Sequence, residues 1–263
     1  MKTILITGAY GGMGRAAVRH LRDRGWRVFA LDRRVEAGEE NIIPLQADIT
    51  DADSVRAACA AVTAQTGRLD AILHFAGIYM LDSMVEMTEE DFRRIFAVNV
   101  EGAFLVNRTF LPLLGEGSRI LMTTSELATL DPLPFTGVYA VTKGALDRYA
   151  YSLRMELQLL GIGVSVLRAG AVGTDMLGVS TAALDRFCEG TQLYSCNAER
   201  FRQIVGRVEA RHISTEQIAR KCEKILTRRR PAFAYSINRN LLLCLLNILP
   251  ARMQFWIIRM ILR

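Results

Sequence analysis

The stretch TGAYGGMG, residues 7–14, decides the fold of this chain. It follows an apolar run of strand length and leads into a segment whose apolar residues recur with helical spacing. Gly8, Gly12 and Gly14 permit a tight turn, a close approach of backbone to a bound anion, and close packing of the helix on the strand. The N-terminus of that helix faces the same place. The stretch therefore predicts a turn that binds the pyrophosphate of a dinucleotide, with an ordinary strand–helix connection as the alternative.

Apolar runs of strand length alternate with longer segments of helical period along most of the chain. We expect strands at 3–7, 27–31, 42–46, 71–75, 119–123, 164–168 and 232–236. We expect helices at 13–24, 52–66, 89–98, 103–114, 138–160 and 215–227. Because right-handed strand–helix–strand crossovers build a parallel sheet, the sequence predicts an α/β fold. This is a Rossmann-type doubly wound parallel sheet of about seven strands with helices on both faces.

The length of 263 residues, of which 51% are hydrophobic, fits one domain over 1–236. The segment 173–211 interrupts the alternation of strands and helices. We expect it to form a lid over the site, with a peripheral helical insertion as the alternative. Residues 237–263 are expected to form an apolar, amphipathic helical tail.

The second expected strand ends at Asp32, whose carboxylate can accept hydrogen bonds from both ribose hydroxyls of an adenosine and repels a 2′-phosphate. Arg33 and Arg34 follow directly and could attract that phosphate if Asp32 turned away. We therefore expect NAD as the cofactor, with NADP as the alternative. Asp48 and Ile49 follow the third strand and are expected to contact the adenine ring, or else to belong to an ordinary helix N-terminus.

Tyr139 and Lys143 stand four residues apart in an expected helix, and hence on one face of it. Lys143 is one of four lysines beside 29 arginines, which suggests that this position needs an amine. An unperturbed tyrosine, with a pKa of about 10, is a weak acid and base at neutral pH, and a neighbouring cation lowers that pKa. The pair therefore predicts a proton-transfer site in which Tyr139 takes a proton from an alcohol or donates one to a ketone.

These motifs resemble those of the short-chain dehydrogenase/reductase family, and the match extends to about Ser236. The family's Thr-Gly-x3-Gly-x-Gly pattern is complete at residues 7–14, and YAVTK at 139–143 carries its Tyr-x3-Lys pattern. The resemblance implies hydride transfer to or from a nicotinamide ring, with Tyr139 as general acid or base and Lys143 also binding the nicotinamide ribose. It further implies a homodimer or homotetramer formed through the long helices expected at 103–114 and 138–160.

The resemblance assigns further site residues. Ser125 is expected to orient the substrate oxygen, but its spacing from Tyr139 is one residue longer than usual, so Thr124 is an alternative. Asn99 is expected to support a water chain to the lysine, and Thr174 to bind the nicotinamide carboxamide. No metal site is expected. The residues expected to contact the dinucleotide are Gly8, Tyr10, Gly12, Met13, Gly14, Asp32, Asp48, Ile49, Ala76, Gly77, Asn99, Tyr139, Lys143 and Thr174.

The sequence departs from the family pattern in two places. The element Asn-Asn-Ala-Gly appears as HFAG at 74–77, which keeps Ala76 and Gly77 and loses both asparagines together with their hydrogen bonds. His74 is expected to be a packed strand residue rather than a catalyst. Ala169 replaces the proline of the Pro-Gly…Thr element, which predicts a looser connection to the lid.

The C-terminal quarter carries the positive charge, because residues 200–263 hold 14 basic and 3 acidic side chains while the whole chain has a net charge of +6. The apolar run LLLCLLNIL at 241–249 is too short and interrupted for a membrane span. Arg252, Arg259 and Arg263 share one face of the next expected helix. This predicts a helix on a membrane surface with its cations toward anionic headgroups, and burial against protein is the alternative. No nucleic-acid motif is present, so no such partner is expected.

The five cysteines are scattered and never form Cys-x-x-Cys, so we expect free thiols in a reducing compartment. Residues 1–8 contain no cleavage site of a secretory signal. We therefore expect a cytoplasmic protein that is peripheral on a membrane if its tail binds there.

The leading functional prediction is a dehydrogenase or reductase acting on a lipophilic secondary alcohol or ketone. A steroid- or retinoid-like substrate is favoured because similar apolar tails occur in the family's retinol and hydroxysteroid dehydrogenases. One alternative is a 3-oxoacyl thioester reductase, which would draw on NADPH. The other is a non-catalytic sensor or scaffold that binds NAD, a role that predicts loss of the Tyr–Lys pair.

Overall fold

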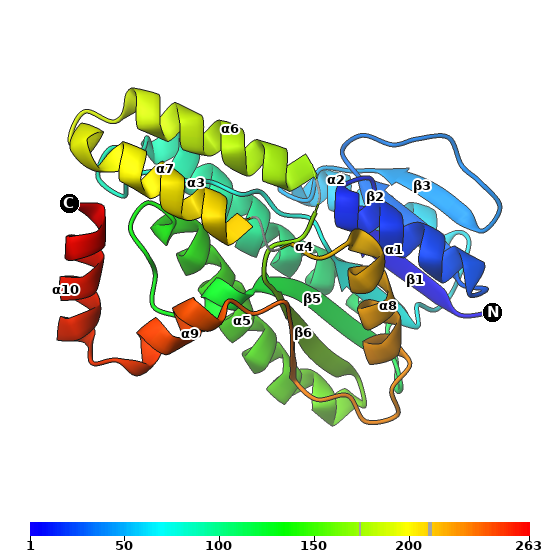
Figure 1. Ribbon diagram of the computed structural model, residues 1–263. Coiled ribbons are helices and arrows are strands. Elements are labelled where there is room, and N and C mark those ends of the chain that lie inside the picture. Colours follow the sequence, from blue (N-terminus) through cyan, green and yellow to red (C-terminus); the bar gives the residue numbers. More distant parts are fainter. Residues whose placement is uncertain (174, 210–211) are drawn as a thin grey trace.

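The computed structural model describes residues 1–173, 175–209 and 212–263. A single sheet of seven parallel strands in the order β3-β2-β1-β4-β5-β6-β7 forms its centre (Figure 1). The order reverses beside β1, so β1 and β4 diverge at the point where doubly wound sheets bind ligands. The strands are β1 (Thr3–Thr7), β2 (Arg27–Asp32), β3 (Ile42–Gln46), β4 (Ala71–His74), β5 (Arg119–Ser125), β6 (Gly163–Ala169) and β7 (Ala234–Ile237).

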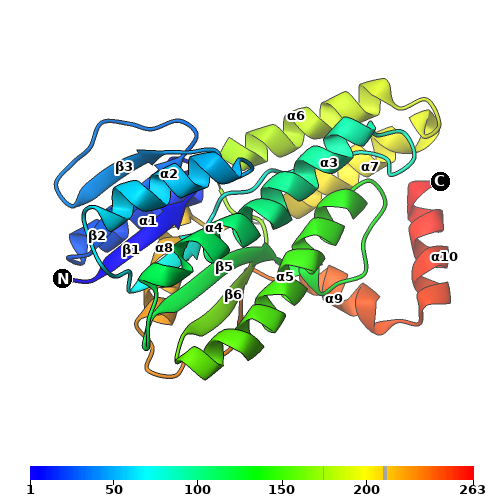
Figure 2. The same ribbon diagram turned by 180° about the vertical axis from the view of Figure 1, so that it is seen from behind.

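Helices cover both faces of the sheet, as Figures 1 and 2 show from opposite sides. Successive strand residues point to opposite faces, so Ile4 and Ile6 join the core under α1 and α8, while Leu5 joins the core under α2, α4 and α5. The apolar strands are therefore buried on both sides, as parallel strands usually are. These helices are α1 (Gly12–Asp23), α2 (Ala52–Thr63), α4 (Gly102–Phe110), α5 (Gly137–Leu157) and α8 (Thr215–Leu226). The predicted fold class is confirmed.

The element boundaries differ from the predictions by a few residues. The largest difference concerns the helices expected at 89–98 and 103–114, which form one continuous path of three parts. These parts are α3 (Glu89–Phe96), a π-helical turn η1 (Ala97–Glu101) and α4. A π-turn adds one residue to the ordinary helical repeat and often marks a functional position. The described residues also form short 3-10 turns at η2 (Leu111–Leu113), η3 (Glu126–Ala128) and η4 (Gln158–Leu160).

The segment expected as a lid contains two helices, α6 (Asp175–Gly190) and α7 (Ser195–Glu209). They pack around a small separate core in which Phe135 contacts the rings of Phe187 and Phe201, with centroid distances of 4.4 and 5.0 Å. Glu86 holds the turn between the two helices, because its carboxylate accepts hydrogen bonds from Thr191 Oγ1 and from the backbone of Gln192 and Leu193.

The C-terminal tail forms α9 (Leu241–Ile248) and α10 (Ala251–Leu262), which Figure 1 shows in orange to red beside α5 and α7. Leu262 of α10 packs against the small core of the lid segment. The predicted boundary at 236 falls inside β7, which ends at Ile237. Among the described residues, the helices are all too short or too polar to cross a bilayer.

Candidate active site

The glycine turn between β1 and α1 leaves space for an anion because two of its positions exclude a side chain. Gly8 has a φ of 66°, and a Cβ there would lie 2.5 Å from the Ala76 nitrogen. A Cβ at Gly14 would lie 2.0 Å from the Gly8 oxygen, where α1 crosses the turn. These contacts confine both positions to glycine, and they hold the N-terminus of α1 next to the ends of β1 and β4.

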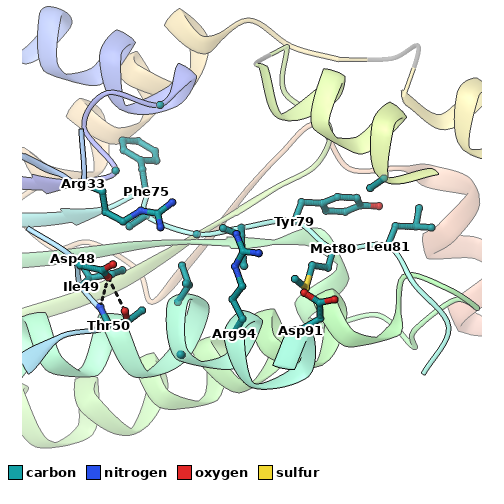
Figure 3. Close-up of a pocket in the computed structure, with 18 of the residues that line it drawn as sticks. Arg33, Asp48, Ile49, Thr50, Phe75, Tyr79, Met80, Leu81, Asp91 and Arg94 are labelled. Carbon is teal, nitrogen blue, oxygen red and sulfur yellow. Dashed lines mark hydrogen bonds between the residues drawn. The ribbon is translucent and has the colours of Figure 1, made fainter. Parts of the chain in front are cut away.

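A cleft of about 990 Å³ runs from this turn along the carboxyl ends of the strands. Its lining includes most of the residues that the sequence predicts at a dinucleotide: Gly8, Gly12, Met13, Gly14, Asp32, Asp48, Ile49, Ala76 and Gly77. Figure 3 shows Asp48 and Ile49 at one end of the cleft and Tyr79 and Met80 toward the other. A cleft of this size and lining, with a backbone cradle that side chains would fill, fits a nicotinamide dinucleotide.

Asp32 is held at the end of β2 by backbone donors. Its Oδ2 accepts a hydrogen bond from Tyr10 N at 3.1 Å and its Oδ1 accepts one from Arg33 N at 2.7 Å. The neighbouring Asp48 accepts from the backbone and the hydroxyl of Thr50, which helps to lower the pKa of its carboxyl against the opposing effect of burial. Two carboxylates therefore lie at the end of the cleft where an adenosine would bind.

One predicted cofactor contact needs correction, and another lies outside the described residues. The half-buried side chain of Tyr10 packs against the core beneath α1 and is not among the residues that line the cleft, although Glu36 and Asp32 act on its hydroxyl and its backbone N–H donates to Asp32. Packing of its apolar ring against the residues under α1 stabilises this position. The other residue, Thr174, lies outside the described residues.

A second cavity of about 240 Å³ adjoins the cleft and contains Ser125, Tyr139 and Lys143. Tyr139 and Lys143 lie one turn apart on α5, and Ser125 ends β5. The Ser125 and Tyr139 hydroxyls share a hydrogen bond, and the Lys143 ammonium lies 5.6 Å from the centre of the Tyr139 ring. The structure therefore brings these three predicted residues together at one end of the dinucleotide cleft.

The Lys143 ammonium is buried and donates to the Thr123 carbonyl at 3.4 Å. A Cβ at Gly77 would lie 3.3 Å from the Lys143 Nζ, so the small residue leaves the amine room beside the cleft. Burial lowers the pKa of Lys143 to about 8, because desolvation penalises its charged form.

The pKa of Tyr139 differs from the expectation that Lys143 lowers it. Burial raises the pKa of the phenol above its ordinary value, the nearby Tyr79 raises it further, and the hydrogen bond from Ser125 lowers it. The rings of Tyr79 and Tyr139 lie edge to face with centroids 4.8 Å apart. The protein alone therefore holds Tyr139 as a neutral phenol at neutral pH.

Of the two hydroxyls proposed for the substrate oxygen, Ser125 contacts the phenol and Thr124 is directed elsewhere. The Thr124 Oγ1 lies 3.3 Å from the Asp147 carboxylate, which also forms a two-point ion pair with Arg168 at 2.9 and 2.7 Å. Side chains of successive strand residues alternate between faces, so only one of the two can face Tyr139. The geometry favours Ser125.

Asn99 is buried in the π-turn and supports the wall of the site. Its Oδ1 accepts from Ile78 N at 2.8 Å, and its Nδ2 donates to Ile78 O and to Thr142 Oγ1 at 3.0 and 3.1 Å. Asn99 thus fixes the segment after β4 to α5 at Thr142, the residue directly before the lysine for which it was expected to support a water chain. The π-turn directs the Asn99 amide toward the segment after β4 and toward α5.

His74 is a packed strand residue, as the sequence suggested. Its Nε2 lies 2.9 Å from Asn107 Oδ1, and the Asn107 amide donates to the Tyr149 hydroxyl at 3.2 Å. Burial lowers the pKa of His74 to about 4, so the ring is neutral at physiological pH. This network joins β4, α4 and α5.

Several lining residues were not foreseen from the sequence. Tyr79 and Glu126 follow directly on predicted motifs, and their positions after strand ends could have indicated them. Leu243 lies in the tail, and nothing local marks it as part of the site. The lid segment also contributes apolar residues to the smaller cavity, namely Phe201, Ile204 and Val205.

The chain is similar to known dehydrogenases and reductases in sequence and in fold. The family described as short chain dehydrogenase matches residues 2–185. Versicolorin reductase 1 of Aspergillus parasiticus is 32% identical over 186 residues, covering 66% of this chain and 71% of the relative. Estradiol 17-beta-dehydrogenase 2 of Mus musculus is 32% identical over 189 residues, covering 67% of this chain and 50% of the relative. The structure of 3-ketoacyl-(acyl-carrier-protein) reductase from Brucella melitensis complexed with NADH shares the fold, with a TM-score of 0.73 at 22% identity over 90% of this chain and 96% of that one.

Proposed function

The chain belongs to the short-chain dehydrogenase family, and from that premise we propose that it interconverts a lipophilic secondary alcohol and its ketone, with Tyr139 as general acid and base. It is an NAD(P)-dependent oxidoreductase acting on CH–OH groups. The observation that carries the proposal is the hydrogen-bonded pair of Ser125 and Tyr139 with Lys143 beside it, in a cavity that opens on the dinucleotide cleft.

The proposed chemistry divides between the chain and the dinucleotide. A bound nicotinamide supplies the acceptor or donor of the hydride. Ser125 orients the substrate oxygen, and Tyr139 donates a proton to the ketone oxygen or takes one from the alcohol. Burial keeps the phenol protonated in the protein alone and makes it a weaker acid, so donation of its proton depends on stabilisation of the charge left on the phenol oxygen. The Lys143 ammonium stabilises negative charge on the phenol oxygen after that donation.

A lipophilic substrate is proposed because the cavity around the hydroxyls is mostly apolar. Its apolar lining includes Ile78, Leu127, Leu133, Val172, Phe201, Ile204, Val205 and Leu243. The relative named estradiol 17-beta-dehydrogenase supports a steroid-like molecule, and a retinoid-like one would fit the same lining. We propose that α6 and α7 form the lid over this cavity, since both helices contribute to the lining of the site.

NAD is the proposed cofactor because the Asp32 carboxylate is held at the adenosine end by two backbone donors. A 2′-phosphate there would meet this negative charge, although Arg33 lies in the same cleft (Figure 3). We expect NADH to bind more tightly than NADPH in fluorescence titrations, and Asp32→Ser to reduce the difference. Tighter binding of NADPH by the wild-type protein would contradict this assignment and would favour the 3-oxoacyl thioester reductase.

The test of the catalytic proposal is Tyr139→Phe. We expect the loss of at least about 100-fold in kcat for ketone reduction, because the proton donor is removed, with NADH affinity unchanged within a few-fold. Tyr151→Phe is the matched control, since Tyr151 lies on the same helix and its side chain is exposed. A Tyr139→Phe protein that retains wild-type turnover would refute the proposal, and a wild-type protein that binds NADH but reduces no ketone would indicate the sensor or scaffold.

We also propose that the tail lies on an anionic membrane surface of the cytoplasmic side. Apolar side chains of α9 and α10 are exposed, including Leu242 at 73% and Trp256 at 64%, and the basic Arg252, Arg259 and Arg263 are exposed beside them. This combination matches an interfacial helix rather than a helix buried in the protein. The proposed dimer or tetramer interface lies on α4 and α5. Phe104, Tyr151 and Met155 are exposed there, and a monomer in sedimentation velocity would contradict it.

A further inference from the structure

The C-terminal tail is joined to the substrate cavity by its first residues. Asn240 N donates to the Glu126 Oε2 at 2.7 Å, and Glu126 is the residue directly after Ser125. Asn238 Nδ2 donates to the Ala171 carbonyl at 2.8 Å. A Cβ at Gly170 would lie 1.9 Å from the Asn238 oxygen, so the chain crosses the end of β6 in direct contact. The tail therefore begins against two strand ends that carry the site.

Glu126 is suited to hold the tail because it is itself buried in the wall of the cavity. Burial raises the pKa of its carboxyl, while the hydrogen bond from Asn240 and the charge of Arg239 lower it. A hydrogen bond to a buried carboxyl group contributes more than one at the surface, because the loss of the donor leaves the group unsatisfied.

The first turn of α9 places Leu243 in the cavity. The Asn240 side chain caps the helix, since its Oδ1 accepts from Leu242 N and Leu243 N at 3.0 and 3.3 Å. Leu243 then lines the cavity that holds Ser125, Tyr139 and Lys143. Its neighbours on the helix, Leu242 and Leu245, are 73% and 60% exposed. The helix therefore presents Leu243 to the site, and Leu242 and Leu245 to the solvent.

The far end of the tail helix is also fixed to the segment after β5. Asn247 Oδ1 accepts from Asp131 N at 2.5 Å, and the buried Gln254 donates to the Asp131 carboxylate at 3.2 Å. Because α9 is held at both ends, the position of Leu243 in the cavity is defined.

From these contacts we propose that Leu243 determines which substrates fit the cavity and that Glu126 is the positioning residue that holds it there. The tail is thus a wall of the active site as well as a surface for lipid. This inference rests on the proposed function, because it concerns the shape of the same cavity. Leu243 acts by volume alone: a smaller side chain admits bulkier ketones and a larger one excludes them.

The activity test compares Leu243→Ala and Leu243→Phe with the same substitutions at Leu242. The probes are cyclohexanone, 2-decalone and a 3-ketosteroid, each reduced with NADH. We expect Leu243→Phe to raise the KM of the largest ketone relative to the smallest by about 10-fold, and Leu243→Ala to lower this ratio. NADH affinity and the Leu242 variants should stay within about twofold of wild type. Equal KM ratios in the Leu243 and Leu242 variants would overturn the proposal.

The positioning role has a readout that does not require turnover. Amide hydrogen exchange at 238–244 should accelerate about 10-fold or more in Glu126→Ala, and much less in Glu126→Gln, whose amide oxygen still accepts from Asn240 N. Unchanged exchange in Glu126→Ala would overturn the role of Glu126. If the wild-type protein reduced none of the ketones, the proposed function would fail, while the exchange experiment would still decide whether Glu126 holds the tail.

Discussion

Burial of the Lys143 ammonium destabilises the folded protein, and the same residue belongs to the proposed active site. It is 6% exposed, and burial lowers its pKa to about 8. Between pH 8 and 10.5 the unfolded chain therefore binds more protons at this amine than the folded one. The destabilisation is complete below pH 8 and disappears as the pH rises to 10.5. A buried amine retained among so many arginines is the pattern of a residue kept for chemistry.

We expect Lys143→Met to raise the free energy of unfolding at pH 7 by about 1–3 kcal/mol while it abolishes turnover. The gain should shrink toward zero by about pH 10.5, since the lysine is then neutral in both states. Urea denaturation at several pH values measures it. A less stable variant at pH 7 would show that the hydrogen bond of Lys143 to Thr123 outweighs the desolvation of the amine.

At the scale of secondary-structure elements, a buried polar network joins β4 to α4 and α5 where the family pattern has asparagines. His74 contacts Asn107, which in turn contacts Tyr149. In the folded protein the pKa of His74 is about 4, so its ring stays neutral above that pH. In the unfolded chain the same ring takes up a proton below about pH 6.5. These elements should therefore lose stability as the pH falls from 6.5 to 4.

The expected loss over this pH range is roughly 3 kcal/mol relative to His74→Gln, whose amide can still reach Asn107 but does not titrate. Thermal unfolding at pH 7, 5.5 and 4 compares the two proteins. His212→Gln is the control, because its side chain is exposed. Parallel acid sensitivity of the wild-type and His74→Gln proteins would rule out His74 as the cause.

At the scale of the whole molecule, the C-terminal tail combines exposed apolar and basic side chains. The leucines of α9 and Trp256 of α10 are exposed, as are Arg252, Arg259 and Arg263, in a C-terminal quarter of the sequence that carries 14 basic and 3 acidic side chains. Attraction of basic residues to anionic lipid is screened by salt, whereas insertion of Trp256 and the leucines is not. The two contributions can therefore be separated.

We expect the protein to sediment with vesicles that contain phosphatidylserine, and less so with phosphatidylcholine alone. Trp256→Glu should reduce binding at all salt concentrations by about 10-fold or more, and Arg252→Glu should reduce it mainly at low salt. Both residues are exposed and neither lines the cavity, so ketone reduction in solution should not change. Wild-type protein that stays in the supernatant with both kinds of vesicle would exclude the membrane proposal.

The sequence alone determined the glycine turn, the order of strands and helices, and the Tyr139–Lys143 pair. Each of these depends on residues within one or two turns of each other, where backbone sterics and helical periodicity act directly. The apolar runs of strand length were equally local, and their alternation with helical segments predicted helices on both faces of the sheet.

Only the tertiary structure decided that Ser125 rather than Thr124 faces Tyr139, and that the half-buried ring of Tyr10 packs against the core instead of lining the cleft. It alone placed Leu243 in the same cavity as Ser125 and Tyr139, which lie more than a hundred residues earlier in the chain, and paired Asn240 with Glu126. Contacts of this kind depend on how whole elements pack on the sheet, because a side chain's neighbours across the chain are set by the sum of many weak packing contacts. No short stretch of sequence contains that sum.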